Sequence, residues 1–149
     1  MRHLFALAIA VSCTVALAGA ASADSAYHTQ RFLLSGDDGA GGGGMVVNAH
    51  ANGPTIYSHE VYVLNSAVPG TYQVTLNVFD TSLNCTGELR VFDTATLTTD
   101  AEGNGAADAT FTLEQVDSTG LRPGTVSAYW ELSGLEASYS TACTVITLD

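Results

Sequence analysis

The stretch Val126-Ser-Ala-Tyr-Trp-Glu-Leu132 alternates apolar and polar side chains at every second position. Tyr72-Gln-Val-Thr-Leu-Asn-Val78 and Ala107-Asp-Ala-Thr-Phe-Thr-Leu113 repeat the pattern. Successive side chains of a β-strand point to opposite faces of the sheet, so this alternation places one face on a core and the other in water. Such alternation is typical of antiparallel sheets and indicates how the rest of the chain is built.

Six further segments are rich in Thr and Val, which suit a half-buried pleated surface. They cover Thr29–Leu34, Met45–Ala51, Ile56–Leu64, Glu88–Phe92, Ala95–Thr99 and Cys143–Leu148. Turn residues separate the runs at Pro69-Gly70, Asp100–Gly105 and Arg122-Pro-Gly124. Short strands with regular turns, and almost no helical signal, predict a single antiparallel β-sandwich of seven to nine strands. The glycine-rich segment Ser35–Gly44 is expected to be a flexible loop.

Two stretches resemble segments of known domains. Pro69-Gly-Thr-Tyr-Gln-Val-Thr-Leu76 and Thr98-Thr-Asp-Ala-Glu-Gly-Asn-Gly105 are similar to parts of immunoglobulin-like and transthyretin-like β-sandwich domains in bacterial secreted proteins. The resemblance implies an immunoglobulin-like sandwich. It implies no activity, because domains of this kind range from adhesins to appendages of enzymes.

The N-terminal segment Met1–Ala23 has the features of a secretory signal peptide. A short basic start precedes an apolar run, and Ala21-Ser-Ala23 supplies the small residues of a cleavage site. The apolar run is shorter than the ~20 residues that a membrane span needs. Cleavage before Cys13, with lipidation of that cysteine, is the alternative. We therefore expect a secreted or periplasmic protein with no membrane span and one domain over residues 24–149.

The chain is strongly acidic. It has 15 Asp and Glu residues against four arginines and no lysine, and its net charge is −11. The predicted mature chain keeps Arg31, Arg90 and Arg122, which makes its net charge −12. Binding to nucleic acid or anionic lipid needs clustered Lys and Arg, so neither is an expected partner. The acidity is consistent with a soluble secreted protein and, alternatively, with cation binding.

Cys85 and Cys143 are the two cysteines of the predicted mature chain. Two cysteines in an oxidising compartment predict one disulfide. The alternative is a pair of metal ligands, which is not favoured because the chain has no Cys-x-x-Cys or His-x-Cys motif.

The sharpest candidate metal site is a set of oxygen-bearing side chains. Asp100, Glu102 and Asn104 alternate along the chain ahead of Gly105, and Asp108 stands at the ninth position of the loop that begins at Asp100. This spacing is typical of the start of a calcium loop, although the twelfth position lacks the usual Glu. A hairpin turn uses the same residue types and is the alternative. We expect no cofactor, with calcium at this turn as the alternative.

Catalytic candidates are weak. His50 and His59 lie on neighbouring predicted strands and are a hypothetical copper or zinc pair. Ser58-His-Glu60 holds the residue types of a triad, but neighbours in a strand point to opposite faces. The chain has no Gly-x-Ser-x-Gly motif, and nothing selects a pair of carboxylates among its 15 acidic residues. An enzyme is therefore not the favoured interpretation.

Aromatic residues suggest a possible sugar-binding face. Trp130 alternates in step with Val126 and Leu132 and is expected in the core. Tyr129 and Glu131 share the opposite face and are candidate ligand-binding residues, with Tyr57 and His59 as additions.

The favoured function is a secreted or periplasmic, non-enzymatic binding or structural domain. Its expected partner is an extracellular protein or carbohydrate that the sequence does not identify. A calcium- or carbohydrate-binding module is the first alternative, and a small hydrolase or metalloenzyme is the second.

Overall fold

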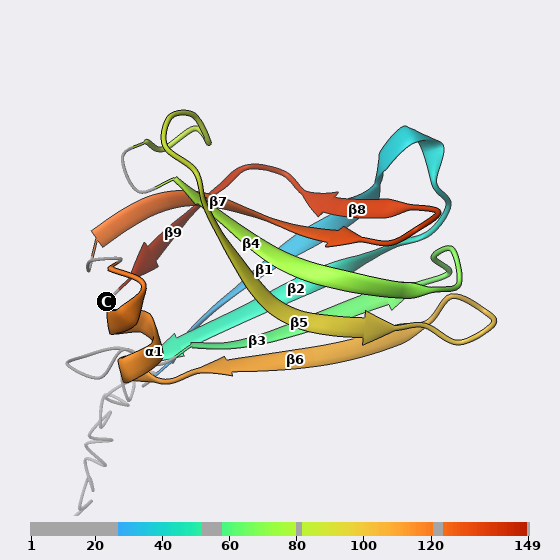
Figure 1. Ribbon diagram of the computed structural model, residues 1–149, viewed down its shortest axis with the longest axis horizontal. Helices are drawn as coiled ribbons and strands as arrows, with labels where there is room; N and C mark the ends of the chain where they lie inside the picture. Colours follow the sequence, from blue (N-terminus) through green and yellow to red (C-terminus); the bar gives the residue numbers. More distant parts are fainter. Residues whose placement is uncertain (1–26, 52–57, 80–81, 121–123, 149) are drawn as a thin grey trace, which may run out of the picture.

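The computed structural model describes residues 27–51, 58–79, 82–120 and 124–148 (Figure 1). Within these ranges it has nine β-strands, one short α-helix and one 3₁₀ turn. The elements are β1 Tyr27–Gly36, η1 Asp37–Gly39, β2 Gly43–Ala51, β3 Ser58–Asn65, β4 Thr71–Phe79, β5 Arg90–Thr98, β6 Gly105–Phe111, α1 Leu113–Ser118, β7 Gly124–Ser133, β8 Ser138–Thr141 and β9 Thr144–Leu148. The predicted all-β class and strand number are confirmed. The predicted leader lies outside the described residues.

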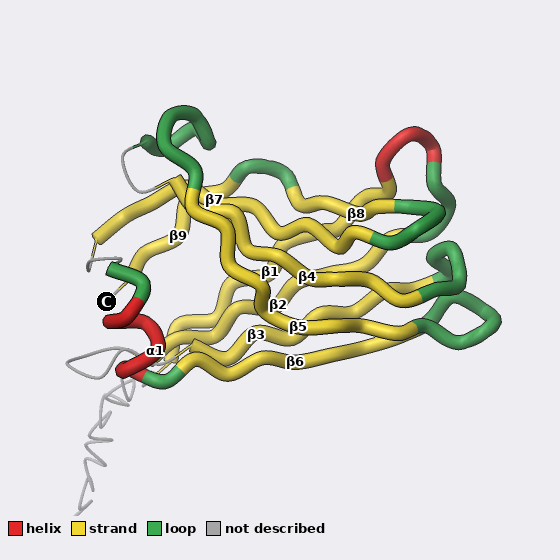
Figure 2. The backbone as a smooth tube through the Cα atoms, viewed as in Figure 1, coloured by secondary structure: helices red, strands yellow, loops and turns green. Residues whose placement is uncertain are grey.

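All the strand pairs are antiparallel. The strands follow the order β5-β4-β7-β8-β1-β2-β3-β6, and β9 pairs with β7. The sheet folds back on itself, so that β1, β2, β3 and β6 form one layer and β4, β5, β7, β8 and β9 form the other (Figures 1 and 2). β1 pairs with β8 on one side, β5 approaches β6 on the other, and the sheet is nearly closed. Three connections pass between the layers, from β3 to β4, β5 to β6 and β6 to β7, as in Greek-key sandwiches.

The core lies between the two layers and follows the predicted alternation. Trp130 is fully buried on β7, which confirms that it belongs to the core. The ring of Phe32 stacks on it from β1, with 5.0 Å between ring centroids. The other core residues are Leu34, Val46, Tyr62, Leu64, Ala67, Tyr72, Val74, Val78, Leu97, Val126, Ala128, Leu132, Tyr139 and Ile146. Both layers contribute to this core, so neither can form it alone.

β5 is one strand where the sequence predicted two. Val74 pairs with Ala95 and Thr75 pairs with Asp93, so Thr94 is an extra residue on β5. A bulge of this kind lets a strand continue while its side chains change faces. Core-facing residues therefore occupy even positions before Thr94 and odd positions after it, as Phe92 and Ala95 do. This change of phase made the sequence of β5 look like two short strands.

Three elements, η1, α1 and β8, were not predicted, and β6 begins and ends two residues earlier than predicted. β8 is a four-residue strand with a single large apolar side chain, which is too short for a clear alternation. β6 ends at Phe111, and α1 follows instead of a continued strand. Thr112 Oγ1 accepts the Gln115 backbone N–H at 3.3 Å, and Gln115 Oε1 accepts the Thr112 N–H at 2.8 Å. This reciprocal capping box explains why the chain turns into a helix here.

The glycine-rich segment is a hairpin connection between paired strands. β1 continues to Gly36 and β2 begins at Gly43, which pairs with Ser35. A Cβ atom on Gly44 would lie 1.9 Å from the Val63 carbonyl oxygen, so this position requires glycine for the close approach of β3. Part of the predicted flexible loop therefore belongs to the sheet.

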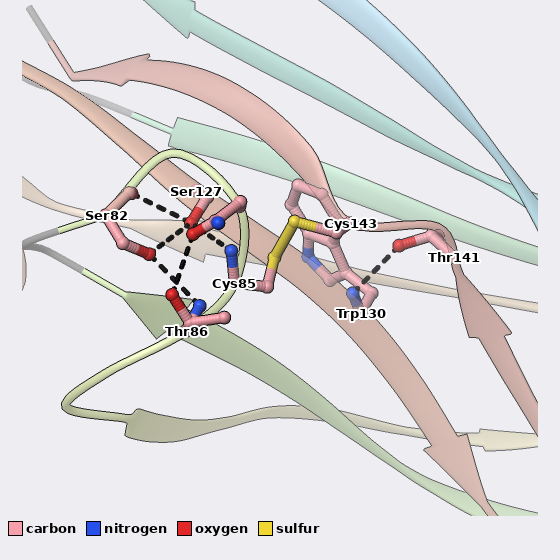
Figure 3. The surroundings of a disulfide bond; sticks show 8 residues. Ser82, Cys85, Thr86, Ser127, Trp130, Thr141 and Cys143 are labelled. Carbon is pink, nitrogen blue, oxygen red and sulfur yellow. Dashed lines mark hydrogen bonds between the residues drawn. A yellow bond between two sulfur atoms is a disulfide. The ribbon is translucent and has the colours of Figure 1, made fainter.

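The predicted disulfide between Cys85 and Cys143 is present, with 5.9 Å between their Cα atoms (Figure 3). It joins the β4–β5 connection to the β8–β9 connection.

Hydrogen bonds hold the β4–β5 connection to β7 as well. The Cys85 N–H donates to Ser127 Oγ at 2.9 Å, and Ser127 Oγ donates to the Ser82 carbonyl at 2.9 Å. Ser127 is fully buried although it alternates with the core residues of β7, because this connection packs over it.

Candidate functional site

The predicted calcium-binding turn connects β5 to β6. Asp100 Oδ1 accepts the backbone N–H groups of Glu102 at 3.0 Å and Asn104 at 2.8 Å. Asn104 Oδ1 accepts the Ser66 N–H at 3.1 Å. These oxygens therefore bind backbone donors of the turn and of the β3–β4 connection beside it, which is the role that the hairpin alternative gives them.

Gly103 completes this junction. Its φ angle is +79°, and a Cβ atom there would lie 1.9 Å from the Ala67 carbonyl oxygen. Its own carbonyl accepts the Ala67 N–H at 3.0 Å. The turn is thus a packed contact between two connections at one end of the sandwich.

Asp108, the fourth predicted metal ligand, does not lie in the turn. It is on the outer face of β6, where its Oδ2 lies 3.6 Å from His59 Nε2 on β3. Both side chains are exposed, at 70% for Asp108 and 41% for His59. Across the described part of the chain, no three His, Cys, Asp or Glu side chains gather as they would around a metal ion. Calcium binding at the turn stays a prediction.

The two histidines that the sequence suggested as a metal pair lie on the paired strands β2 and β3. His59 pairs with Ala49, whereas His50 pairs with Ser58. The His50–His59 metal pair stays a hypothesis. In Ser58-His-Glu60 the acid is buried and the histidine is half-exposed, as expected for strand neighbours.

Tyr129 and Glu131 lie on the outer face of β7, as the alternation predicted. The Tyr129 ring stacks on Phe79 with 6.2 Å between centroids, and Ser133 Oγ donates to Glu131 Oε1 at 2.9 Å. Partial burial, and secondarily the charge of Glu131, raise the pKa of Tyr129. Neighbouring positions are polar, because β4 places Asn77 opposite Tyr129.

Of the two additions that the sequence suggested, His59 does not join the Tyr129 face. His59 lies on β3 in the other layer, and Tyr57 is outside the described residues. Among the described residues, the candidate binding groups of the Tyr129 face are one half-exposed aromatic ring and one carboxylate.

A buried carboxyl group is the feature that sequence reasoning missed in the core. Glu60 is 2% exposed, and its Oε2 accepts the Trp130 indole N–H at 2.8 Å and the Tyr62 hydroxyl. Burial raises the pKa of Glu60, and the two hydrogen bonds oppose this change. Burial, followed by the charge of Glu60 and its hydrogen bond, also raises the pKa of Tyr62. Two donors to one oxygen fix the orientation of the Trp130 ring inside the sandwich.

Other polar residues share this part of the interior. Asn48 pairs with Glu60 across β2 and β3, and Gln30 pairs with Asn48 across β1 and β2. Ser58 Oγ donates to Asn48 Oδ1 at 3.0 Å, whereas Gln30 Oε1 is buried without a hydrogen-bond partner. The row of Gln30, Asn48 and Glu60 on the inner face is therefore polar. The next row toward Leu64 consists of Phe32, Val46 and Tyr62 and is largely apolar. Asn48 and Glu60, at the centre of the polar row, are buried in the core.

The outer face of β1, β2, β3 and β6 is largely apolar, and we call it the apolar face. Strand register places the side chains of this face in three rows across all four strands, and the polar row of Ser35, Gly43 and Asn65 continues the face beyond them. The three rows are Leu33, Met45, Val63 and Ala106; Arg31, Val47, Val61 and Asp108; and Thr29, Ala49, His59 and Thr110.

The apolar face is accessible. Leu33 is 77% exposed, and Met45, Val47, Val61 and Val63 are each partly exposed. A hollow of about 370 Å³ lies on this face, lined by His59, Val61, Ala106, Ala107 and Asp108. The signal was present in the sequence, because Met45-Val-Val47 and Val61-Tyr-Val63 are apolar at consecutive positions rather than alternate ones.

Comparisons with known proteins found no matching protein-family model, no matching curated protein and no matching solved structure. In the ranges that the structure describes, no helix has the length and hydropathy needed to cross a membrane. The candidate sites therefore rest on the geometry above.

Proposed function

We propose that the chain is a non-enzymatic binding domain that acts outside the cytoplasm and makes its contact through the apolar face. The exposure of this four-strand face is the observation that carries the proposal. Soluble monomers rarely expose a contiguous apolar surface of several hundred Å², and such surfaces mark interaction sites. The leader pattern of Met1–Ala23 and the disulfide support an extracytoplasmic location.

The arrangement of reactive side chains supports binding rather than catalysis. The buried carboxyl of Glu60 is held by the side chains of Tyr62 and Trp130 inside the core. The His59–Asp108 pair lies on an open sheet face, where no described serine or cysteine joins it as a nucleophile.

Site-specific photo-crosslinking tests this function. A photoreactive amino acid replaces Leu33 in the full chain, which is expressed with its own leader and irradiated in the exporting cells. Leu83 is the matched control, because it is 59% exposed but lies in the β4–β5 connection, away from the apolar face. We expect an adduct from position 33 and much less from position 83. Equal yields, or no adduct from position 33, would contradict the proposal.

A second candidate function is carbohydrate binding at the Tyr129 face. It is favoured by one partly exposed aromatic ring beside Glu131 and a polar strand. Titration of the protein with neutral oligosaccharides, followed by tyrosine chemical shifts, tests it. Binding that Tyr129→Ala abolishes would support this candidate, and unchanged shifts would remove it.

A further inference from the structure

We infer that the occupant of the apolar face is a second copy of this chain, seated face to face about a two-fold axis that runs along the strands between β2 and β3. This inference rests on the proposed function and names its partner. The charges, the side-chain sizes and the extent of the face favour a second copy.

The charges select the direction of the axis. The middle row begins with Arg31 at the β1 edge and ends with Asp108 at the β6 edge, with Val47 and Val61 between them. A two-fold axis along the strands exchanges the two edges. Arg31 then faces Asp108 of the partner subunit, and Val47 faces Val61 of the partner subunit.

The alternative two-fold axis runs across the strands and leaves each edge opposite itself. Arg31 would then face the same residue of the second copy, and so would Asp108. Two like-charge contacts in one small interface are strongly unfavourable. The arrangement along the strands converts both contacts into opposite-charge pairs.

Side-chain sizes are complementary in the same arrangement. The exposed Leu33 faces Ala106 of the partner subunit, which lines the hollow on that face. His59 faces Ala49 of the partner subunit. Leu33 and His59 thus each meet an alanine, whereas Met45 faces Val63 of the partner subunit, and sheets that pack face to face lie about 10 Å apart.

Packed sheets are usually rotated by about 30° relative to each other, and this rotation keeps the Arg31–Asp108 and Val47–Val61 pairs within reach. Arg31 lies about 7 Å from the axis, since strands are spaced about 4.8 Å apart. A rotation of about 30° moves its target by about 4 Å, which a long arginine side chain can span.

The size of the face indicates a weak dimer. Four strands of about seven residues each cover roughly 450 Å² per copy in projection. The total is close to the ~1,000 Å² at which specific interfaces begin. We therefore expect a dissociation constant of about 10–100 μM, rather than a permanent dimer.

Sedimentation equilibrium of the full chain, expressed with its own leader and purified after export, tests the arrangement by charge reversal. Arg31→Glu and Asp108→Arg each create two like-charge contacts per dimer and should weaken dimerisation at least about 10-fold. The double variant restores opposite charges and should return to within about 3-fold of the wild type. Glu114→Arg is the matched control for Asp108→Arg, because it makes the same charge change on α1, which does not belong to the face.

Each outcome decides the inference. A wild-type chain that stays monomeric at about 1 mM overturns it, and so does a double variant no better than the single ones. The melting temperatures of all the variants should match, since both residues are exposed. If the purified chain is monomeric while the crosslink from position 33 contains another protein, the second copy is wrong and the proposed function stands. The absence of any such crosslink removes the proposed function itself.

Discussion

Removal of the disulfide should destabilise the protein mainly through its unfolded state. Cys85 and Cys143 are 58 positions apart, and a closed loop of this size lowers the chain entropy of the unfolded ensemble. The entropy relation gives about 4 kcal/mol at 25 °C. The perturbation is the double replacement Cys85→Ala/Cys143→Ala.

The folded state should change little by comparison. The backbone and side-chain hydrogen bonds that join Ser82, Cys85 and Ser127 do not involve the sulfur atoms. They keep the β4–β5 connection on β7 when the bridge is absent. Most of the expected loss therefore comes from the greater freedom of the unfolded chain.

Guanidinium chloride unfolding, followed by Trp130 fluorescence, measures the loss. With a slope of about 4 kcal/mol per M, the midpoint should fall by about 1 M, and the melting temperature should fall by about 12–20 °C. The slope should also rise slightly, because an unbridged unfolded chain exposes more surface. Wild-type protein in excess dithiothreitol is the control and should behave like the double variant.

A midpoint shift below about 0.3 M with an unchanged slope would refute this reasoning. It would mean that the unfolded chain already brings residues 85 and 143 together, so that the bridge removes little freedom. A much larger loss, with altered near-ultraviolet dichroism, would instead show that the bridge holds the folded β4–β5 connection in place.

Three further outcomes are expected. Burial raises the pKa of Glu60 above its ordinary value of about 4.5, so the folded state keeps a proton that the unfolded state loses. Protonated Glu60 therefore contributes to the unfolding free energy fully below about pH 4.5, and this contribution is lost as pH rises through the folded pKa. The unfolding free energy of the wild type should therefore decline relative to Glu60→Gln between pH 4 and 8 in urea titrations, and a flat difference would contradict the raised pKa. Asp100→Ala should cost about 1–2 kcal/mol in EDTA and in millimolar calcium alike, because it removes the acceptor of two backbone N–H groups. A cost that thermal melts find only with calcium would instead establish the predicted ion site. Trp130→Phe should destabilise the protein by about 1–3 kcal/mol, since it leaves a void and removes one donor to Glu60. A loss below about 0.5 kcal/mol in denaturant titrations would show that this hydrogen bond contributes little.

Much of the fold could be predicted because alternation is a local property of an extended chain. Val126–Leu132 has one clearly apolar face, and Trp130 is buried where that face placed it. The disulfide could be predicted because only two cysteines follow the predicted leader. The bulge at Thr94 could not, since it depends on how β5 pairs with β4.

The candidate site was harder to predict for the same reason. In Val61-Tyr-Val63 every position is apolar, and alternation cannot say which face belongs to the core. Glu60 shares the face of Tyr62 and is therefore buried, against the usual preference of a carboxylate for water. Asp108 fitted a calcium spacing along the chain, yet in the sheet its neighbour is His59.

The sequence by itself determined that the chain forms antiparallel strands, which strands have a clear inner face, and which cysteines pair. These are consequences of side-chain chemistry at neighbouring positions and of the cysteine count. Only the tertiary structure decided which apolar face is covered and which is exposed. It did so by pairing β1, β2, β3 and β6, because register brings residues as distant in sequence as Arg31 and Asp108 into one row across the sheet.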